Sequence, residues 1–592
     1  MANIPYTYLS MKKDGADIIS CPLASEGVEL SRKSKKAKDG KCCLMGNFDV
    51  FSDRIATRSA QKKLSLENFN EGEVHSITKE PFCGKTIIHS GTNLFCLGKD
   101  GLSVLSDKLP DAKSLFCVFM SKLYIYCAER IFSVNNLFEC TEEEPYAPLM
   151  YEKIPTTFIT IPKSDKPFNM LSPRITVTYT ESQVDRFELP EDADITRPFE
   201  IYEGNKKLDP SICTFTEKMI TINLSGIPSS RVVKIVYYLK DKSSMENSDF
   251  LSGCNSVIAF GGDTSGGTRV FFTGNENYKG RYYKSELMDP LYVSSEEFEI
   301  IGNGSENITC LKKMYGDLIL FTEGTVYRMG YTLREDGVFF ATKEISNGVG
   351  CDCPDSVQLI DNRVVFLNSG KGVFIIDSTE TTGEQNIKPI AGNVLKGEGF
   401  GLIENDKEKL HKAYSMDFDR KYMLFVDGKA YIWDYDISAF SESGNYAKAQ
   451  ERLVWYLYDG LFGDIFFESP MGLSSLSCEN CELYTFDEDF ERKDVFCRYV
   501  SGEISRLNPT VRKYITEISF IMKKKSDAVY NLSAYSDGEK YYEVALQGLS
   551  DRKEKVKFRL PSRALYGFGF EISGVGEIEI EQVLVKCTAA KE

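Results

Sequence analysis

A hairpin in the second half of the chain constrains the fold more than any other feature. Residues 422–433 read Tyr-Met-Leu-Phe-Val-Asp-Gly-Lys-Ala-Tyr-Ile-Trp. Two runs rich in β-branched and aromatic residues flank Asp427-Gly428, the kind of dipeptide that most readily adopts the positive φ angles of a tight type I′ turn. The segment therefore predicts one antiparallel hairpin.

Variants of this hairpin recur from about residue 90 to about residue 500, at 93–98, 122–134, 317–328, 363–376 and 482–486. Their spacing of roughly 40 to 60 residues is typical of propellers and other repeat arrays. Each hairpin is too small to bury its own apolar face, so neighbouring units must stack. We therefore predict an all-β protein built on a β-propeller of about six to eight blades.

The composition supports this fold class and restricts the functions. The 592 residues leave room for roughly two to four domains, and 32 Tyr and 38 Phe against 2 Trp favour β structure. A net charge of -16 argues against a protein that reads nucleic-acid sequence, because such proteins neutralise phosphates with a positive surface. The same charge is compatible with a channel wall along which DNA slides.

Targeting and redox features predict synthesis in a cytoplasm. The longest apolar candidate, 115–132, contains Lys122, Glu129 and Arg130, so we expect no membrane span. The N-terminus lacks the pattern of a secretory signal. Seventeen cysteines without regular spacing predict free thiols in a reducing compartment.

Changes in pattern along the chain predict its domain organisation. The alternating segments 175–179, 220–224 and 233–239 predict a small sandwich, and short strands separated by polar turns predict another after about residue 500. The predicted parts are an N-terminal arm with a propeller-closing strand (1–70), the first part of the propeller (71–150), an inserted β-sandwich (151–247), the second part of the propeller (248–500) and a C-terminal β-sandwich or jelly roll (501–592).

The N-terminal part carries two separate predictions. The basic run 32–38 predicts a solvated arm or loop, with nucleic-acid contact as the alternative. The segment 47–58 alternates enough to enter a sheet, and we expect it to complete the last blade, which would close the ring and hide its edges.

Candidate chemistry is sparse. Cys478 and Cys481 have the spacing of half a zinc site, and Cys351 and Cys353 could supply the other half, but a turn with two buried thiols explains each pair. The histidines are His75, His89 and His411, and none has a catalytic motif beside it. The glycine-rich segment 261–267 lacks the Gly-Lys-Ser/Thr ending of a phosphate loop. We therefore predict no catalytic, cofactor-binding or metal-binding residues.

Several phrases in the chain resemble a family of tailed-bacteriophage virion proteins that includes, more distantly, the nozzle proteins of short-tailed phages. Those phrases are Phe260-Gly261-Gly262, the segments 269–275, 281–285, 289–292 and 318–323, and the opening Asn47-Phe-Asp-Val with Arg58. Ser59 stands where the family has a glycine after the arginine. The resemblance covers the chain from about residue 44 to 590.

The resemblance implies a non-enzymatic structural protein of the tail or head–tail region of a tailed-phage virion, assembled in the host bacterial cytoplasm. It implies a homo-oligomeric, nozzle-like ring around the DNA path that contacts other tail or portal-proximal proteins, supports genome ejection and passes DNA without sequence recognition.

Two other functions stay open at the sequence level. One is a receptor- or glycan-binding tail protein, in which Tyr535, Tyr541 and Tyr542 of the C-terminal sandwich stack on sugars, although strand tyrosines are more often core. The other is a propeller hydrolase, which needs carboxylates converging on a central funnel.

Overall fold

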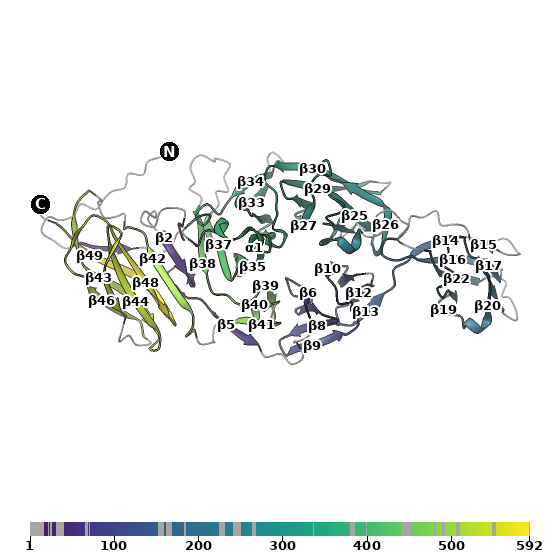
Figure 1. Cartoon of the computed structure of the whole chain (residues 1–592), viewed down its shortest axis with the longest axis horizontal. Helices are drawn as coiled ribbons and strands as arrows, with labels where there is room; N and C mark the ends of the chain where they lie inside the picture. Colours follow the sequence, from purple (N-terminus) through teal and green to yellow (C-terminus); the bar gives the residue numbers. More distant parts are fainter. Residues whose placement is uncertain are drawn as a thin grey trace.

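The structure is a computed structural model of the chain. It describes residues 17–21, 23, 27–30, 41–51, 53–64, 69, 72–128, 130–151, 159–161, 169–182, 185–223, 231–240, 250–262, 268–334, 337–378, 385–397, 399–439, 452–478, 481–487, 492–504, 510–546 and 552–590. The basic run 32–38 lies outside these residues. The molecule is elongated, with a central ring of small sheets and one β module at each end (Figure 1).

The central ring is a propeller, and within the described residues it has seven four-stranded antiparallel blades. Six are separate sheets, and the seventh is formed by the first four strands of a nine-stranded sheet. The blades are β6–β9 (Val74–Ile77, Thr86–Ser90, Asn93–Gly98, Gly101–Ser106), β10–β13 (Ser114–Phe119, Lys122–Cys127, Arg130–Val134, Cys140–Glu143), β23–β26 (Ser256–Phe260, Arg269–Thr273, Arg281–Glu286, Asp289–Ile300), β27–β30 (Ile308–Met314, Asp317–Thr322, Thr325–Arg334, Gly337–Asn347), β31–β34 (Gln358–Ile360, Arg363–Asn368, Gly372–Ser378, Gln385–Pro389), β35–β38 (Tyr414–Phe418, Lys421–Val426, Lys429–Ala439, Arg452–Tyr458) and β39–β41 with β5 (Ile465–Ser469, Gly472–Ser477, Glu482–Asp487, Ala60–Leu64). We number them blade 1 to blade 7 in this order.

The first strands of neighbouring blades contact one another around the ring, from β6 through β10, β23, β27, β31 and β35 to β39. The ring closes where the Glu468 backbone N–H donates to the Lys79 carbonyl at 3.0 Å. The Asp427-Gly428 turn of blade 6 has φ angles of 51° and 71°, as expected for the predicted type I′ turn. The predicted fold class, an all-β propeller with additional β modules, is confirmed.

The strand that completes the last blade lies within the predicted N-terminal part, 1–70, but after the segment 47–58. It is β5, which pairs antiparallel with β41. The predicted segment 47–58 instead forms β3 (Phe48–Val50) and β4 (Ile55–Thr57), and β4 pairs with a C-terminal strand. The reason is burial: Phe48 and Ile55 are fully buried, so these strands need a covered sheet, whereas Lys62 and Lys63 suit the solvent-exposed edge of a blade.

The inserted module leaves the propeller after β13 and returns at blade 3. One sheet has the order β14-β16-β22-β18-β19 (Ala147–Tyr151, Arg174–Ser182, Arg231–Tyr238, Glu200–Glu203, Lys206–Lys207), and the other has the order β15-β17-β21-β20 (Ile159–Thr160, Arg186–Glu188, Met219–Ile222, Cys213–Thr216). Its buried residues form their own cluster. We call this module the insert.

The C-terminal module also has two sheets, and strands from the N-terminal part complete them. The first contains β3-β4-β49-β43-β46 with β1 and β47, of which the last five span Ile578–Ala589, Lys513–Lys524, Glu554–Arg559, Asp17–Cys21 and Ala564–Leu565. The second continues from blade 6 as β2-β42-β48-β44-β45 (Cys42–Gly46, Phe496–Ser501, Phe568–Val575, Val529–Ser536, Glu539–Ala545). We call this module the sandwich; it begins at β42, a few residues before the predicted boundary.

Helices are short. The described residues contain the α-helix α1 (Lys407–His411) and 3₁₀ turns at Pro210–Ile212, Leu251–Gly253, Pro354–Ser356 and Leu402–Glu404. No helix in the described part of the chain is long and apolar enough to span a bilayer.

Candidate functional site: two buried joints of the propeller

Two of the three histidines meet between blades 1 and 2. The rings of His75 (β6) and His89 (β7) lie 4.9 Å apart between centroids. His75 Nε2 is 2.7 Å from Asp111 Oδ1, and His89 Nδ1 is 2.8 Å from Ser114 Oγ. No motif in the sequence predicts this cluster, although the two positions fall on adjacent strands of one hairpin.

The His89 side chain cannot serve as an accessible base or nucleophile partner. His89 is fully buried, and Ser114 is 2% exposed. Burial, followed by the neighbouring His75, lowers the pKa of His89 from 6.5 to about 4. His89 is therefore a neutral imidazole that is buried together with Ser114, and its role in this structure is packing.

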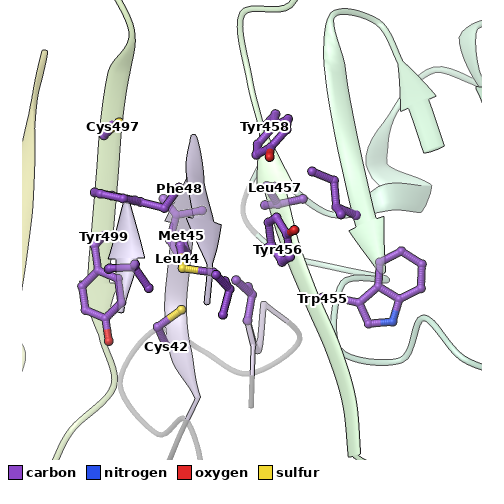
Figure 2. Close-up of a cluster of buried hydrophobic side chains, with 14 of the residues drawn as sticks. Cys42, Leu44, Met45, Phe48, Trp455, Tyr456, Leu457, Tyr458, Cys497 and Tyr499 are labelled. Carbon is purple, nitrogen blue, oxygen red and sulfur yellow. The ribbon is translucent and has the colours of Figure 1, made fainter. Parts of the chain in front are cut away.

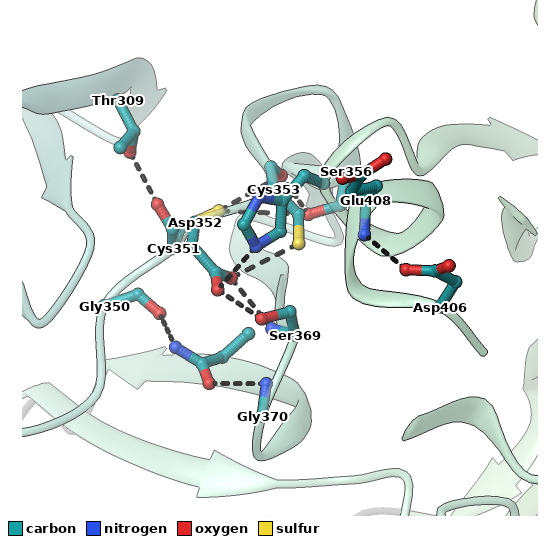
Figure 3. A network of polar contacts seen from close by, with 12 residues as sticks. Thr309, Gly350, Cys351, Asp352, Cys353, Ser356, Ser369, Gly370, Asp406 and Glu408 are labelled. Carbon is teal, nitrogen blue, oxygen red and sulfur yellow. Dashed lines mark hydrogen bonds and ion pairs between the residues drawn. The ribbon is translucent and has the colours of Figure 1, made fainter. Parts of the chain in front are cut away.

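The Cys351 and Cys353 pair lies in a polar network at the start of blade 5 (Figure 3). Cys351 Sγ donates to the Cys353 carbonyl at 3.2 Å, and the Asp352 carboxylate accepts from the Ser369 N–H at 2.8 Å. His411 reaches the same carboxylate at 3.5 Å. The network fixes the chain between blades 4 and 5, as expected for a turn with two buried thiols.

Cys353 is a buried thiol of this network. Burial, followed by the Asp352 charge, raises the pKa of the Cys353 thiol. Asp352 is half-buried, and although desolvation acts to raise its pKa, hydrogen bonds from Ser369 lower it. Within the described residues, no group of three or more His, Cys, Asp or Glu side chains could hold a metal ion.

The other cysteine pair, Cys478 and Cys481, lies in blade 7 between β40 and β41. Cys481 Sγ is 3.2 Å from the Gly72 carbonyl. Burial, followed by Asp464, raises the pKa of Cys478 to about 11. The two cysteine pairs therefore sit in different blades and make separate local contacts.

The other predicted features also belong to the scaffold. The glycine-rich segment 261–267 joins β23 to β24, two antiparallel neighbours, and not a strand to a helix as in a phosphate loop; its residues 263–267 lie outside the described part. Tyr535 donates to Glu571 at 2.7 Å, while Tyr541 and Tyr542 pack against the main core. No observation on these tyrosines favours sugar stacking.

The N-terminal segment that resembles the phage family, Asn47-Phe-Asp-Val with Arg58, forms the contact between the propeller and the sandwich. We call this contact the sandwich joint. Asn47, at a φ of 62°, is 5% exposed. Its Oδ1 accepts from Arg58 Nε and from the Asp459 N–H, each at 2.8 Å, and its Nδ2 donates to the Phe496 carbonyl at 2.8 Å. One side chain thus bonds the N-terminal strands, blade 6 and the sandwich.

Arg58 is the charged centre of the sandwich joint and is 4% exposed. Its guanidinium also donates to the Ser59 carbonyl at 2.8 Å and to the Asp459 carbonyl at 3.4 Å. Burial lowers its pKa from the usual value, while the nearby Tyr458 and Asp49 groups act in the opposite direction. Because arginine keeps its charge in proteins, this buried cation depends on these acceptors.

Apolar side chains surround this centre (Figure 2). Residues of β2 and β3 lie between Trp455–Tyr458 of blade 6 and Cys497 and Tyr499 of the sandwich, and belong to one buried cluster. A small cavity of about 90 Å³ remains at the surface of the joint, between Phe400 and Lys429 on one side and Phe496 and Arg498 on the other.

A second buried asparagine joins the insert to blade 3, at what we call the insert joint. Asn169 is fully buried. Its Nδ2 donates to the Leu291 carbonyl at 2.8 Å, and its Oδ1 accepts from the Val293 and Leu171 N–H groups, each at 3.1 Å. Between these bonds, Tyr292 of β26 packs into the core of the insert.

Another phrase of the resemblance, Gly274-Asn275, fixes the chain where it returns from the insert. Asn275 is 2% exposed, and its Nδ2 donates to the Phe250 carbonyl at 2.7 Å. Gly274 has a φ of 89°, and a Cβ there would lie 1.6 Å from Asn255 Oδ1. Only glycine fits this position, so the phrase is a packing requirement of blade 3.

Comparisons with known proteins add little beyond the fold. No protein-family model matches the chain, and no curated protein matches it in sequence. Among solved structures, it is similar to PorZ, a surface component of the type-IX secretion system of Porphyromonas gingivalis, at 9% identity and a TM-score of 0.31 over 75% of this chain; it spans only 43% of that chain.

A second similarity is to an exo-β-1,3-galactanase from Phanerochaete chrysosporium, at 6% identity and a TM-score of 0.24, over 82% of this chain and 97% of that chain. A third is to the WD40 domain of SCAP from fission yeast, at 9% identity and a TM-score of 0.23, over 87% of this chain and 98% of that chain. These likenesses carry no functional argument. The strand pairing of the chain itself defines its propeller.

Proposed function

We propose that the chain is a non-enzymatic structural component of a tailed-phage virion. In this proposal it occupies the tail or head–tail region as a subunit of a nozzle-like ring around the DNA path, after assembly in the host bacterial cytoplasm. The observation that carries the proposal is that the phrases of the phage resemblance form joints and blade cores: Asn47 and Arg58 hold the sandwich, Asn275 fixes blade 3, and residues 318–321 are fully buried in blade 4.

The connections between modules support a mechanical role. The sheet of blade 6 continues through β2 into the sandwich, so backbone pairing and a shared core cross the boundary. Interfaces inside a chain are usually more polar and allow relative motion unless they are large and apolar. A continuous sheet, with the buried Arg58 bonded beside it, suits a part that keeps its shape under force.

The net charge of the chain supports the proposal that its ring surrounds the DNA path. A net charge of -16 would repel DNA weakly along a channel, so that the polymer could pass without being bound. Ring subunits that meet head to tail use two different surfaces, and the elongated shape offers a separate module at each end (Figure 1).

The test is the mass and shape of the full-length protein, measured by light scattering and negative-stain images, alone and after incubation with portal and tail proteins of a short-tailed phage. We expect a closed ring with an axial hole, of roughly five to twelve copies. Arg58→Met should prevent ring formation, whereas the surface variant Arg130→Met should not. A monomer in every mixture would overturn the proposal.

A further inference from the structure

The outer face of the first sheet of the sandwich is positively charged, although the chain as a whole is acidic. Its strands β49, β43 and β46 are neighbours and lie at the end of the molecule away from the propeller (Figure 1). Residues 552–559 contain five Lys or Arg and one Glu, whereas the whole chain has a net charge of -16. Short segments this rich in Lys and Arg are typical of surfaces that bind polyanions.

Strand alternation places five cations on this face. In β46, every second residue from Lys555 to Arg559 is exposed, because the residues between them pack against the main core. One lysine of β43 and one of β49 point to the same side, each between buried neighbours. We call these five exposed residues the basic face: Lys523, Lys555, Lys557, Arg559 and Lys586.

The sandwich does not neutralise the basic face. Among the residues that the structure describes, none of the five cations lies within 4.0 Å of a carboxylate oxygen. Glu579 of β49 pairs instead with Arg54 at 3.0 Å. Glu581 pairs with Lys553. Glu517 is a single carboxylate that lies in register between two members of the basic face, so positive charge remains in excess.

Protection of an edge strand does not account for the basic face. Lysines on an edge strand prevent pairing with other chains, and β5, the edge strand of blade 7, also carries two of them. Those lysines, Lys62 and Lys63, pair with Asp487 and Glu482. The basic face differs because its cations lack such partners and because two of them lie on β43 and β49, which are inner strands without a free edge.

We propose that the basic face binds the phosphate backbone of duplex DNA without reading its sequence. Alternate residues of a strand are about 6.7 Å apart and neighbouring strands about 4.8 Å apart, so the five cations form a flat array with a straight row along β46. A DNA backbone is a linear row of closely spaced negative charges. Lys and Arg contacts to phosphates position a protein on DNA and carry no sequence information.

The acidic remainder of the chain restricts this contact to one end of the molecule. The inference does not rest on the proposed function, because a basic face at that end binds DNA in a ring subunit or in a monomer.

The experiment measures the binding of a fluorescent duplex of about 20 base pairs to the full-length protein by fluorescence anisotropy, from about 50 to 200 mM NaCl. The logarithm of the binding constant should fall with the logarithm of the salt concentration with a slope of about -3 to -4.5, as for three to five phosphate contacts. Replacing Lys555, Lys557 and Arg559 together by Gln should weaken binding at least tenfold and reduce the slope by about 3.

A matched pair of double variants separates a local contact from the global charge. Lys523→Gln with Lys586→Gln should reduce the slope by about 2. Lys62→Gln with Lys63→Gln changes the net charge by the same amount but removes lysines that are already paired, so affinity and slope should not change. Tryptophan fluorescence during urea unfolding checks that every variant is folded.

Three results would overturn the proposal. The first is the absence of binding at about 50 mM NaCl, or equal binding by the wild type and the folded triple variant. The second is equal competition by phosphatidylserine vesicles, which would make a membrane surface the partner. The third is self-association of the wild type that the triple variant abolishes, which would make an acidic surface of a second copy the partner.

Discussion

The two β modules are attached to the propeller in different ways. The sandwich shares one buried cluster with blades 5 to 7, and a continuous sheet crosses the boundary. The insert has a separate cluster, to which the propeller contributes only Tyr292 among the described residues. Because buried apolar contacts decide which segments unfold together, the sandwich and the propeller should form one cooperative unit, and the insert should form another.

The largest effect should come from truncating one buried side chain in the core of the sandwich and one in the core of the insert. Phe570 of the sandwich and Phe187 of the insert are 1% and 0% exposed, and replacing either by alanine should cost about 3–5 kcal/mol in its own unit. The two tryptophans, Trp433 and Trp455, both lie in blade 6. Tryptophan fluorescence during urea unfolding should therefore shift to lower urea in Phe570→Ala and stay in place in Phe187→Ala. A shift in both variants would show that the insert is not independent.

Breaking the sandwich joint should have the next largest effect. Arg58→Met removes a buried cation and leaves the Ser59 and Asp459 carbonyls without a donor, which should cost about 3 kcal/mol. Fluorescence and the exchange of sandwich amides should report the same loss. The exposed pair of Arg130 and Glu142 provides the control, and Arg130→Met should cost less than about 1 kcal/mol. Equal costs in the two variants would contradict the role of Arg58.

Acid should weaken the propeller unit through His89. In the folded protein its pKa is about 4, and in the unfolded chain it is near 6.5, so between these values the unfolded state binds more protons and stability rises with pH. The His89 contribution is present above pH 6.5 and is lost as pH falls toward 4, which amounts to about 2 kcal/mol between pH 6.5 and 5. Urea titrations at both pH values should show this difference in the wild type and a smaller one in His89→Gln. An equal difference in the variant would exclude His89 as the cause.

The insert joint should give the smallest effect. Asn169→Ala leaves the buried N–H groups of Val293 and Leu171 without their acceptor, at a cost of about 1–2 kcal/mol. Hydrogen exchange should accelerate at 170–171 and 291–293, while tryptophan fluorescence during unfolding stays unchanged. Unchanged exchange at these amides would show that Asn169 does not hold the joint.

The repeating blades of the propeller were predictable from the sequence. The strand that closes the ring was not. Alternation and the Asp427-Gly428 turn act over a few residues, so they predict blades and a ring of about the right size. The position of the closing strand depends on which of two adjacent segments finds a covered sheet: 47–58 alternates, whereas 60–64, Ala-Gln-Lys-Lys-Leu, does not. Only the burial of Phe48 and Ile55 decides it.

In the candidate sites, too, local features were predictable from the sequence, and contacts between distant segments were not. The Asn47 and Arg58 phrase was identified in the sequence, but its partners Asp459 and Phe496 lie more than 400 residues away. The contact of His75 with His89 follows from one hairpin and was predictable in principle. A groove of about 580 Å³ between blades 6 and 7 is lined by residues of β3, β5, β36 and β40, among others, and no local pattern places those segments together.

The most direct test of this account is native-state hydrogen exchange of the full-length protein at increasing urea, followed peptide by peptide. We expect the strands of blades 5 to 7 and of the sandwich to open with one common free energy of unfolding, and the insert to open with a different and lower one. Two results would contradict this expectation: opening of the sandwich separately from blades 5 to 7, or a single opening event for these blades, the sandwich and the insert.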